Sequence, residues 1–176
     1  MHGVGARFTL GALARAGFGN VHPVPSQNEP DGAFPTVSFP NPEEPGALDL
    51  ALALCAGTRS DLLLANDPDA DRCAIAAPFP SGWRMLTGDE LDALLADDAL
   101  RAGRDGVYAC SVVSSTLLST MAAAYSQPYE VTLTGFKWIA ARMRRYEEQV
   151  RAAMGPGFDY DAAPLAERAR LQQQHG

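Results

Sequence analysis

The second half of the chain alternates between helical and extended patterns, and this alternation limits the fold more than any other feature of the sequence. Apolar residues recur at helical spacing over 89–102, over 114–125 and from Phe136 onward. The apolar runs 107–112 and 129–133 lie between these segments and have the length and composition of strands. Helices and strands that alternate with short connections favour an α/β fold with a largely parallel sheet.

The first half contains a less regular version of the same pattern. Helical spacing predicts helices over 9–16 and 46–56, and the apolar run 61–65 predicts a buried strand. Two further runs, 73–77 and 83–86, predict a strand pair joined by a tight turn.

A proline-rich segment separates the first two helices. Residues 21–24 are a short extended candidate, and prolines crowd the following stretch as far as Pro45. Proline has no backbone N–H and cannot complete a sheet ladder, so we expect a long ordered loop here.

These patterns predict two α/β layered domains with mixed or mostly parallel sheets. The first spans residues 1–88 and the second residues 89–154. Residues 155–176 are rich in Ala, Arg and Gln and show no apolar stripe that could dock on a core, so we expect a disordered tail.

Composition argues against several classes of function. A net charge of -7 and a pI near 4.8 would repel a phosphate backbone, so we expect no nucleic acid partner. No stretch approaches the ~18 uncharged apolar residues of a membrane span. The three cysteines form neither a metal motif nor a closed disulfide set and are predicted to be buried thiols. We therefore expect a cytoplasmic protein that does not contact the membrane.

The segment 66–72, with the sequence NDPDADR, carries the strongest chemical signal. Asp67, Asp69 and Asp71 stand at alternate positions and can converge on one hard cation, because oxygen-only ligand sets favour magnesium or calcium. Arg72 follows directly and can hold a phosphate oxygen beside the metal. A metal next to a guanidinium predicts phosphate chemistry.

Three other interpretations of this loop compete. An EF-hand loop needs glycine at its sixth position and glutamate at its twelfth, where this chain has Arg72 and Pro78. A haloacid-dehalogenase-type phosphatase has a similar D-x-D after a buried strand, but its motif continues with threonine or valine where Asp71 stands. An acidic turn without a ligand fits the turn propensity of Asp and Pro.

Five ordered segments of the chain resemble the phosphoglucomutase/phosphopentomutase branch of the α-D-phosphohexomutase family. They are MHGVG at 1–5, FPTVSFPNPEEPGALDLA at 34–51, LLLANDPDADR at 62–72, TGDEL at 87–91 and TLTGFKWI at 132–139. The resemblance implies an isomerase of carbohydrate metabolism, an intramolecular phosphotransferase that interconverts a sugar 1-phosphate with a 6- or 5-phosphate through a phosphoserine. The substrate would be a hexose or pentose phosphate.

The resemblance also implies roles for the acidic loop. Asp67, Asp69 and Asp71 would hold the Mg²⁺ that touches the phosphoserine. Asp71 and Arg72 would in addition contact the phosphosugar.

The segment 134–137 resembles the sugar-contact loop of the family. Thr134 and the backbone at Gly135 would contact sugar hydroxyls, although a plain strand-to-helix turn fits the same residues. Lys137 is the only lysine among fourteen Lys and Arg residues. It would contact a substrate oxygen or transfer a proton, and a solvated surface lysine fits equally well.

Three further polar sites favour structural roles. We assign His2 to loop packing and the carboxylates of Asp89 and Glu90 to the start of a helix. The pair Glu147 and Glu148 is expected on a solvated helix face.

The chain differs from the family in the catalytic serine, the residue that carries the phosphoryl group. No T-[AS]-S-H-N-P string of the catalytic serine loop occurs, and the later sugar-recognition motif and the fourth domain have no counterpart. We therefore expect two incomplete domains, the first without its opening strand, in a fragment that binds magnesium but is inactive alone. The alternatives are a non-catalytic module that complements the missing domains on a separate chain, or a small magnesium-dependent phosphatase with Asp67 as its nucleophile.

Overall fold

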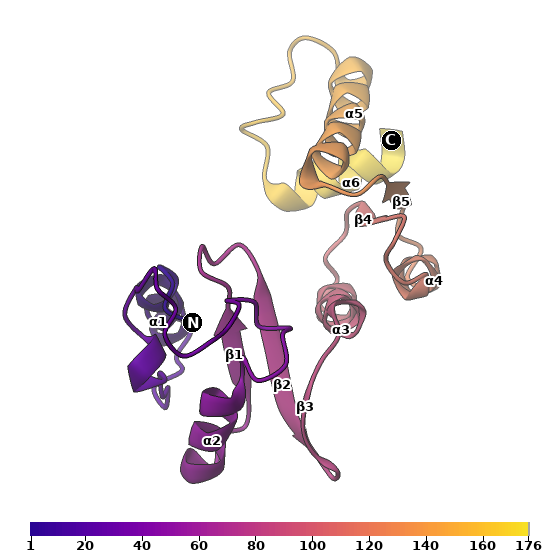
Figure 1. Ribbon diagram of the computed structural model, residues 1–176. Helices are drawn as coiled ribbons and strands as arrows, with labels where there is room; N and C mark the ends of the chain where they lie inside the picture. Colours follow the sequence, from indigo (N-terminus) through magenta and orange to yellow (C-terminus); the bar gives the residue numbers. More distant parts are fainter. Residues whose placement is uncertain (176) are drawn as a thin grey trace. The chain divides into compact units, whose positions relative to one another are not determined.

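The computed structural model describes residues 1–175, and the chain divides into two compact units, Met1–Gly88 and Asp89–Gly176 (Figure 1). Each unit combines helices with a small sheet, so the chain is an α/β protein, as the sequence predicts. No helix within residues 1–175 is both long and apolar enough to cross a membrane.

The first unit contains a three-stranded sheet in the order β1-β2-β3. Its strands are β1 Leu63–Asn66, β2 Cys73–Phe79 and β3 Gly82–Met85. The loop 67–72 between β1 and β2 is too short for the crossover that parallel strands require, so the two strands pair antiparallel. β2 and β3 form an antiparallel hairpin in which Phe79 faces Gly82, which confirms the strand pair predicted there.

Two helices accompany this sheet, and one of them forms the core with it. They are α1 Ala6–Arg15 and α2 Asp49–Thr58, with the short 3-10 helix η1 Pro25–Gln27 between them in the chain. The core of the unit consists of Leu48, Cys55, Leu63, Ala65 and Ala76. α2 therefore packs against β1 and β2, the two strands that flank the acidic loop.

The proline-rich segment forms loops and turns between η1 and α2, as predicted. Residues 21–24, the extended candidate, are not paired with a strand anywhere in residues 1–175. Val24 nevertheless has extended backbone angles, with φ -67° and ψ 112°. Pro23 and Pro25 explain part of this outcome, because neither offers an N–H to a neighbouring strand.

The second unit is built around a two-stranded parallel sheet. Its elements are α3 Gly88–Arg101, β4 Tyr108–Ser111, α4 Leu117–Ala124, β5 Tyr129–Thr132, α5 Phe136–Met154 and α6 Leu165–His175. β4 and β5 pair in parallel with α4 as the connection between them, which is the arrangement that the alternating pattern predicts. Residues 1–175 thus contain one antiparallel and one parallel sheet, which agrees with the predicted α/β class, although neither sheet combines the two kinds of pairing.

The end of the chain differs from the expected disordered tail. α6 packs on α5, and Val150, Tyr160 and Leu171 form a buried cluster between them. The Oη atom of Tyr160 also accepts a hydrogen bond from Nε2 of Gln172 at 2.8 Å. The three apolar residues are spread over 150–171, so no single segment shows the stripe that would have predicted docking.

The three cysteines are free. Cys55 is buried in the core of the first unit and Cys110 is partly buried. The predicted burial is wrong for Cys73, which is exposed because it opens β2 at the end of the sheet, opposite Asn66.

Candidate metal centre

The acidic loop begins where β1 ends. Asp67 follows the last residue of β1 directly, and its side chain is only 1% exposed. Asp69 and Asp71 are exposed, as expected for the outer part of a loop. One carboxylate oxygen from each of the three residues lies within 4.8 Å of the others. The structure thus brings together the three side chains that the sequence singled out.

The backbone of the loop is held by the N-terminal turn. The N–H of Val4 donates to the carbonyl of Pro68 at 2.9 Å, and within the loop the N–H of Ala70 donates to the carbonyl of Asp67 at 3.1 Å. A Cβ atom added to Gly3 would lie 2.3 Å from the oxygen of Pro68. Only glycine permits this close approach. The sequence identified this turn through the resemblance, but it did not indicate that the turn supports the acidic loop.

Arg72 is bound to the buried carboxylate of Asp67. Its Nε atom donates to Oδ2 of Asp67 at 2.8 Å, its Nη2 atom forms an ion pair with the same oxygen at 2.8 Å, and its backbone N–H donates to Oδ1 at 3.2 Å. The side chain of Arg72 is itself exposed. The guanidinium is therefore anchored at one edge and open to solvent at the other, where an anion can reach it.

The carboxylates of this loop shift one another's pKa values. Burial raises the pKa of Asp67, but hydrogen bonds from the backbone of Arg72, from Asp71 and from the guanidinium outweigh burial and leave the pKa below its ordinary value. The hydrogen bond with Asp67 and the nearby charge of Asp69 raise the pKa of Asp71. The exposed carboxylates are thus crowded. An oxygen-only donor set with excess negative charge fits a hard divalent cation.

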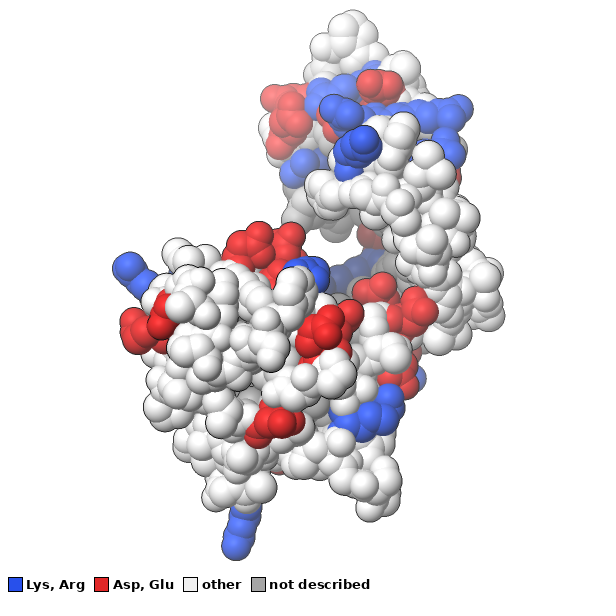
Figure 2. All heavy atoms as spheres, in the orientation of Figure 1, with Lys and Arg blue, Asp and Glu red and all other residues white. Residues whose placement is uncertain are grey.

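The predicted sugar-contact residues lie in the second unit, where β5 leads into α5: Thr134 and Gly135 precede the helix, and Lys137 is its second residue. Thr134, Gly135 and Lys137 are all exposed. Gly135 precedes the first residue of α5, with φ 111°, a conformation that favours glycine. Nζ of Lys137 lies 5.3 Å from the centre of the Trp138 ring, a distance suited to a cation–π contact. Figure 2 shows basic side chains gathered on the part of this unit that contains α5.

The polar residues assigned to structural roles mostly have the expected partners. His2 is buried, and its Nε2 atom lies 2.8 Å from Oγ1 of Thr36, which confirms the loop-packing role. Asp89 and Glu90 lie in the first turn of α3, as predicted. Oδ1 of Asp89 also accepts a hydrogen bond from the N–H of Ser115 at 2.8 Å, a contact between distant segments that the sequence did not reveal.

Two family models match successive parts of the chain. Residues 1–78 match the phosphoglucomutase/phosphomannomutase α/β/α domain II, and residues 87–155 match domain III of the same family. A protein of Haemophilus influenzae described as a probable phosphomannomutase is 47% identical over 142 residues, which cover 79% of this chain. Human phosphopentomutase is 39% identical over 166 residues, which cover 88% of it. A crystal structure assigned to the phosphomannomutases, from Thermus thermophilus, superposes on 82% of the chain with a TM-score of 0.67 and 26% identity.

The chain spans only part of these proteins. It covers 29% of the length of the Haemophilus influenzae protein, 27% of the human one and 32% of the Thermus thermophilus chain. The fold and the matched models define an α/β protein of the phosphoglucomutase/phosphomannomutase type. The chain belongs to the α-D-phosphohexomutase family. This family is generally metal-dependent, in agreement with the donor set of the acidic loop.

Proposed function

We propose that this chain is the metal- and phosphosugar-binding portion of a cytoplasmic phosphosugar mutase, a protein that interconverts a sugar 1-phosphate with a 6- or 5-phosphate. The observation that carries the proposal is the convergence of the Asp67, Asp69 and Asp71 carboxylates at the end of β1, with Arg72 held beside them. Such an arrangement suits phosphoryl transfer, because catalysis of this reaction consists mainly of positioning and charge stabilisation.

The acidic loop would bind Mg²⁺ through one oxygen from each aspartate. When bound, the ion supplies positive charge to the oxygens of a transferring phosphoryl group. Arg72 orients a phosphate oxygen through the edge of its guanidinium that faces solvent, while Asp67 fixes the other edge. The backbone contacts from Val4 and within the loop hold the carboxylates in place before a ligand arrives.

The loop between β5 and α5 would contact the sugar. Gly135 has no side chain and a left-handed φ, so a ligand can approach the backbone there. Thr134 offers a hydroxyl, and Lys137 offers an ammonium that can bind a substrate oxygen. Phosphosugars fit both sets of groups, because they carry hydroxyls and phosphate together.

Magnesium titration by calorimetry tests the metal site. We expect weak binding by the native chain, because three carboxylates leave water to fill the remaining ligand positions. Asp69→Ala is expected to lower the affinity at least about tenfold, since each ligand carboxylate contributes charge as well as an oxygen. Asp92→Ala removes an exposed aspartate outside the loop and is the matched control. Equal affinity of Asp69→Ala and the native chain would refute the metal site.

A second candidate role is that of a non-catalytic module that complements mutase domains on a separate polypeptide. Mixing the chain with the remaining domains of a related mutase tests this role, since activity above that of either part alone is expected. The phosphatase alternative receives no such support, because a nucleophile must reach its substrate and Asp67 is buried and engaged by Arg72 at both carboxylate oxygens.

A further inference from the structure

The first turn of α1 lies directly against the acidic loop. Gly5 precedes the first residue of this helix, and a Cβ atom added to it would lie 2.7 Å from Cβ of Ala70 and 3.6 Å from Cβ of Asn66. The first of these distances is shorter than two carbon atoms in contact can adopt. The helix therefore approaches the loop this closely because residue 5 is glycine.

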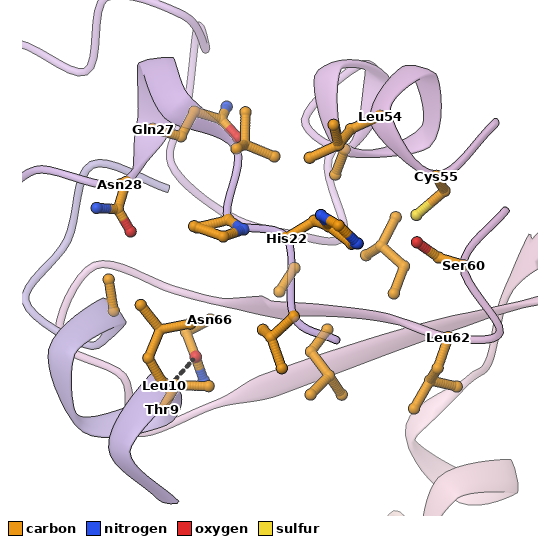
Figure 3. A pocket seen from close by; sticks show the side chains of 18 of the residues that line it. Thr9, Leu10, His22, Gln27, Asn28, Leu54, Cys55, Ser60, Leu62 and Asn66 are labelled. Carbon is orange, nitrogen blue, oxygen red and sulfur yellow. Dashed lines mark hydrogen bonds between the residues drawn. The ribbon is translucent and has the colours of Figure 1, made fainter. Parts of the chain in front are cut away.

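Thr9 lies one helical turn after Gly5, on the same face of α1. Its backbone N–H donates to the carbonyl of Gly5 at 2.9 Å, and its hydroxyl donates to Oδ1 of Asn66, also at 2.9 Å. Figure 3 shows the side chains of Thr9 and Asn66 pointing toward each other, with this hydrogen bond as a dashed line. Asn66 is the last residue of β1 and directly precedes Asp67. The helix thus contacts the start of the loop through a polar side chain as well.

The side chain of Asn66 connects this contact to the other end of the loop. Its Nδ2 atom donates to the backbone carbonyl of Arg72 at 3.3 Å. A carbonyl can only accept, so the NH₂ group of the amide must face Arg72, and Oδ1 is left to accept from the hydroxyl of Thr9. The hydroxyl therefore holds the amide in the orientation that binds Arg72.

The backbone of Arg72 is held on both sides. Its N–H donates to Oδ1 of Asp67 at 3.2 Å, and its carbonyl accepts from Asn66. The side chain that extends from this backbone is 62% exposed, and its Nε atom donates to Oδ2 of Asp67 at 2.8 Å. An exposed guanidinium gains little from packing, so its direction depends on the placement of its backbone and on this carboxylate.

We propose that Thr9 is a positioning residue of the mutase, which orients the guanidinium of Arg72 through the side-chain amide of Asn66. The inference deepens the proposed function and rests on it, because that function gives Arg72 a phosphate to bind. A guanidinium binds phosphate through a planar set of N–H groups in fixed directions, so a small change in its orientation costs affinity. Thr9 acts through two other residues and is not itself a ligand.

Solvent exchange of the Arg72 Nε–H proton tests the proposal, measured by NMR on the full chain labelled with ¹⁵N and free of magnesium. Arg72→Lys lacks this proton and identifies its resonance. Thr9→Val has the shape of threonine without the hydroxyl, and it is expected to speed the exchange about two- to tenfold, the range for one lost hydrogen bond. Thr9→Ser keeps the hydroxyl and is expected to retain the native rate. Thr120→Val makes the same substitution in α4 and is the matched control.

A double variant tests the route through Asn66. Asn66→Ala is expected to speed the exchange at Arg72, and adding Thr9→Val to it is expected to cause no further change. The backbone amides of Leu63 and Ala76 in the core report general loosening and are expected to keep their native rates in Thr9→Val. Unchanged exchange at Arg72 in Thr9→Val, additive effects in the double variant, or equal acceleration at Leu63 and Ala76 would overturn the proposal.

Glucose 1-phosphate, added with magnesium, separates this inference from the proposed function. We expect the ligand to move the Arg72 Nε–H resonance in the native chain and in Thr9→Ser, and to move it less in Thr9→Val at the same concentration. Equal movement in Thr9→Val would contradict the positioning role. No movement in the native chain would refute the phosphate-binding role of Arg72, and the exchange rates would still decide whether Thr9 orients this side chain.

Discussion

At the scale of single residues, the acidic loop depends on contacts from far along the chain. Asp67 is fixed by Arg72 within the loop, but the loop backbone rests on the N-terminal turn at Gly3 and Val4. The order of residues in 66–72 was enough to predict three converging carboxylates, because alternate positions in a tight loop are close in any fold. The support from Gly3 was not predictable, since it joins segments more than sixty residues apart.

The glycine contact leads to a stability prediction. Gly3→Ala would place a Cβ atom 2.3 Å from the backbone oxygen of Pro68, so either the turn or the loop must shift. We expect a loss of about 1–3 kcal/mol in the free energy of unfolding, the range for overpacking, and weaker magnesium binding. Gly19→Ala has open space around the new Cβ atom and is the control for both. Urea unfolding and calorimetry measure the two effects, and unchanged values for Gly3→Ala would contradict the supporting role.

Tyr129 provides a prediction about pH. Its hydroxyl lies 2.8 Å from Sγ of Cys110, and this hydrogen bond together with burial raises the pKa of Tyr129 to about 12. A raised pKa means that the folded state favours the neutral phenol. The contribution to stability is therefore complete below the unfolded pKa of about 10 and is lost as the pH rises from about 10 to about 12.

Ultraviolet titration of the phenolate measures this shift. The difference between the native chain and Tyr129→Phe isolates the titration of Tyr129 from that of the other tyrosines. Cys110→Ala removes the partner and is expected to move this titration to lower pH, whereas Cys73→Ala, at the exposed cysteine, is expected to leave it in place. A Tyr129 titration that is the same in Cys110→Ala would show that the thiol has no influence.

At the scale of elements, sequence patterns predicted where the strands and helices lie better than they predicted which strands pair and in which direction. β4, β5 and the start of α5 lie within one or two residues of the predicted bounds, because each is a distinct apolar run with short connections. The pairing of β1 was harder to predict, since an isolated apolar run has the same appearance in a parallel and an antiparallel sheet. The loop 67–72 decides it through its length. α6 was missed because its docking depends on Tyr160, which lies outside the helix.

The docking of α6 can be tested with two leucines of the same helix. Leu171 is 2% exposed and packs in the cluster with Val150 and Tyr160, whereas Leu165 is 77% exposed. Leu171→Ala is expected to lower the free energy of unfolding by about 3 kcal/mol, because it leaves a cavity between α5 and α6. Leu165→Ala is expected to change it by less than about 0.5 kcal/mol. Denaturant unfolding followed by circular dichroism measures both, and equal effects would show that α6 does not dock as described.

At the scale of the whole molecule, the chain matches two successive domains of the phosphoglucomutase/phosphomannomutase family. The acidic loop and the loop at Gly135 lie in different units, and each unit has a small sheet of its own. The family resemblance was predictable from five segments in a fixed order, because five ordered matches are more specific than any one of them.

We predict that the chain alone does not interconvert glucose 1-phosphate and glucose 6-phosphate, even with magnesium and a sugar bisphosphate added. Phosphoryl shuttling needs a covalent carrier in addition to charge stabilisation, and no serine of this sequence is followed by histidine as in the catalytic loop of the family. Asp67 cannot take over as carrier while its carboxylate is buried and bound to Arg72.

The decisive measurement is a coupled dehydrogenase assay that detects glucose 6-phosphate. The control is a variant in which Asp67, Asp69 and Asp71 are all alanine, which removes the proposed metal ligands together. We expect the two proteins to give the same background rate, because the acidic loop can stabilise a transferring phosphoryl group but offers no group to accept it. Turnover above the control would show that another residue of this chain carries the phosphoryl group, and the predicted inactivity of the chain alone would then be wrong.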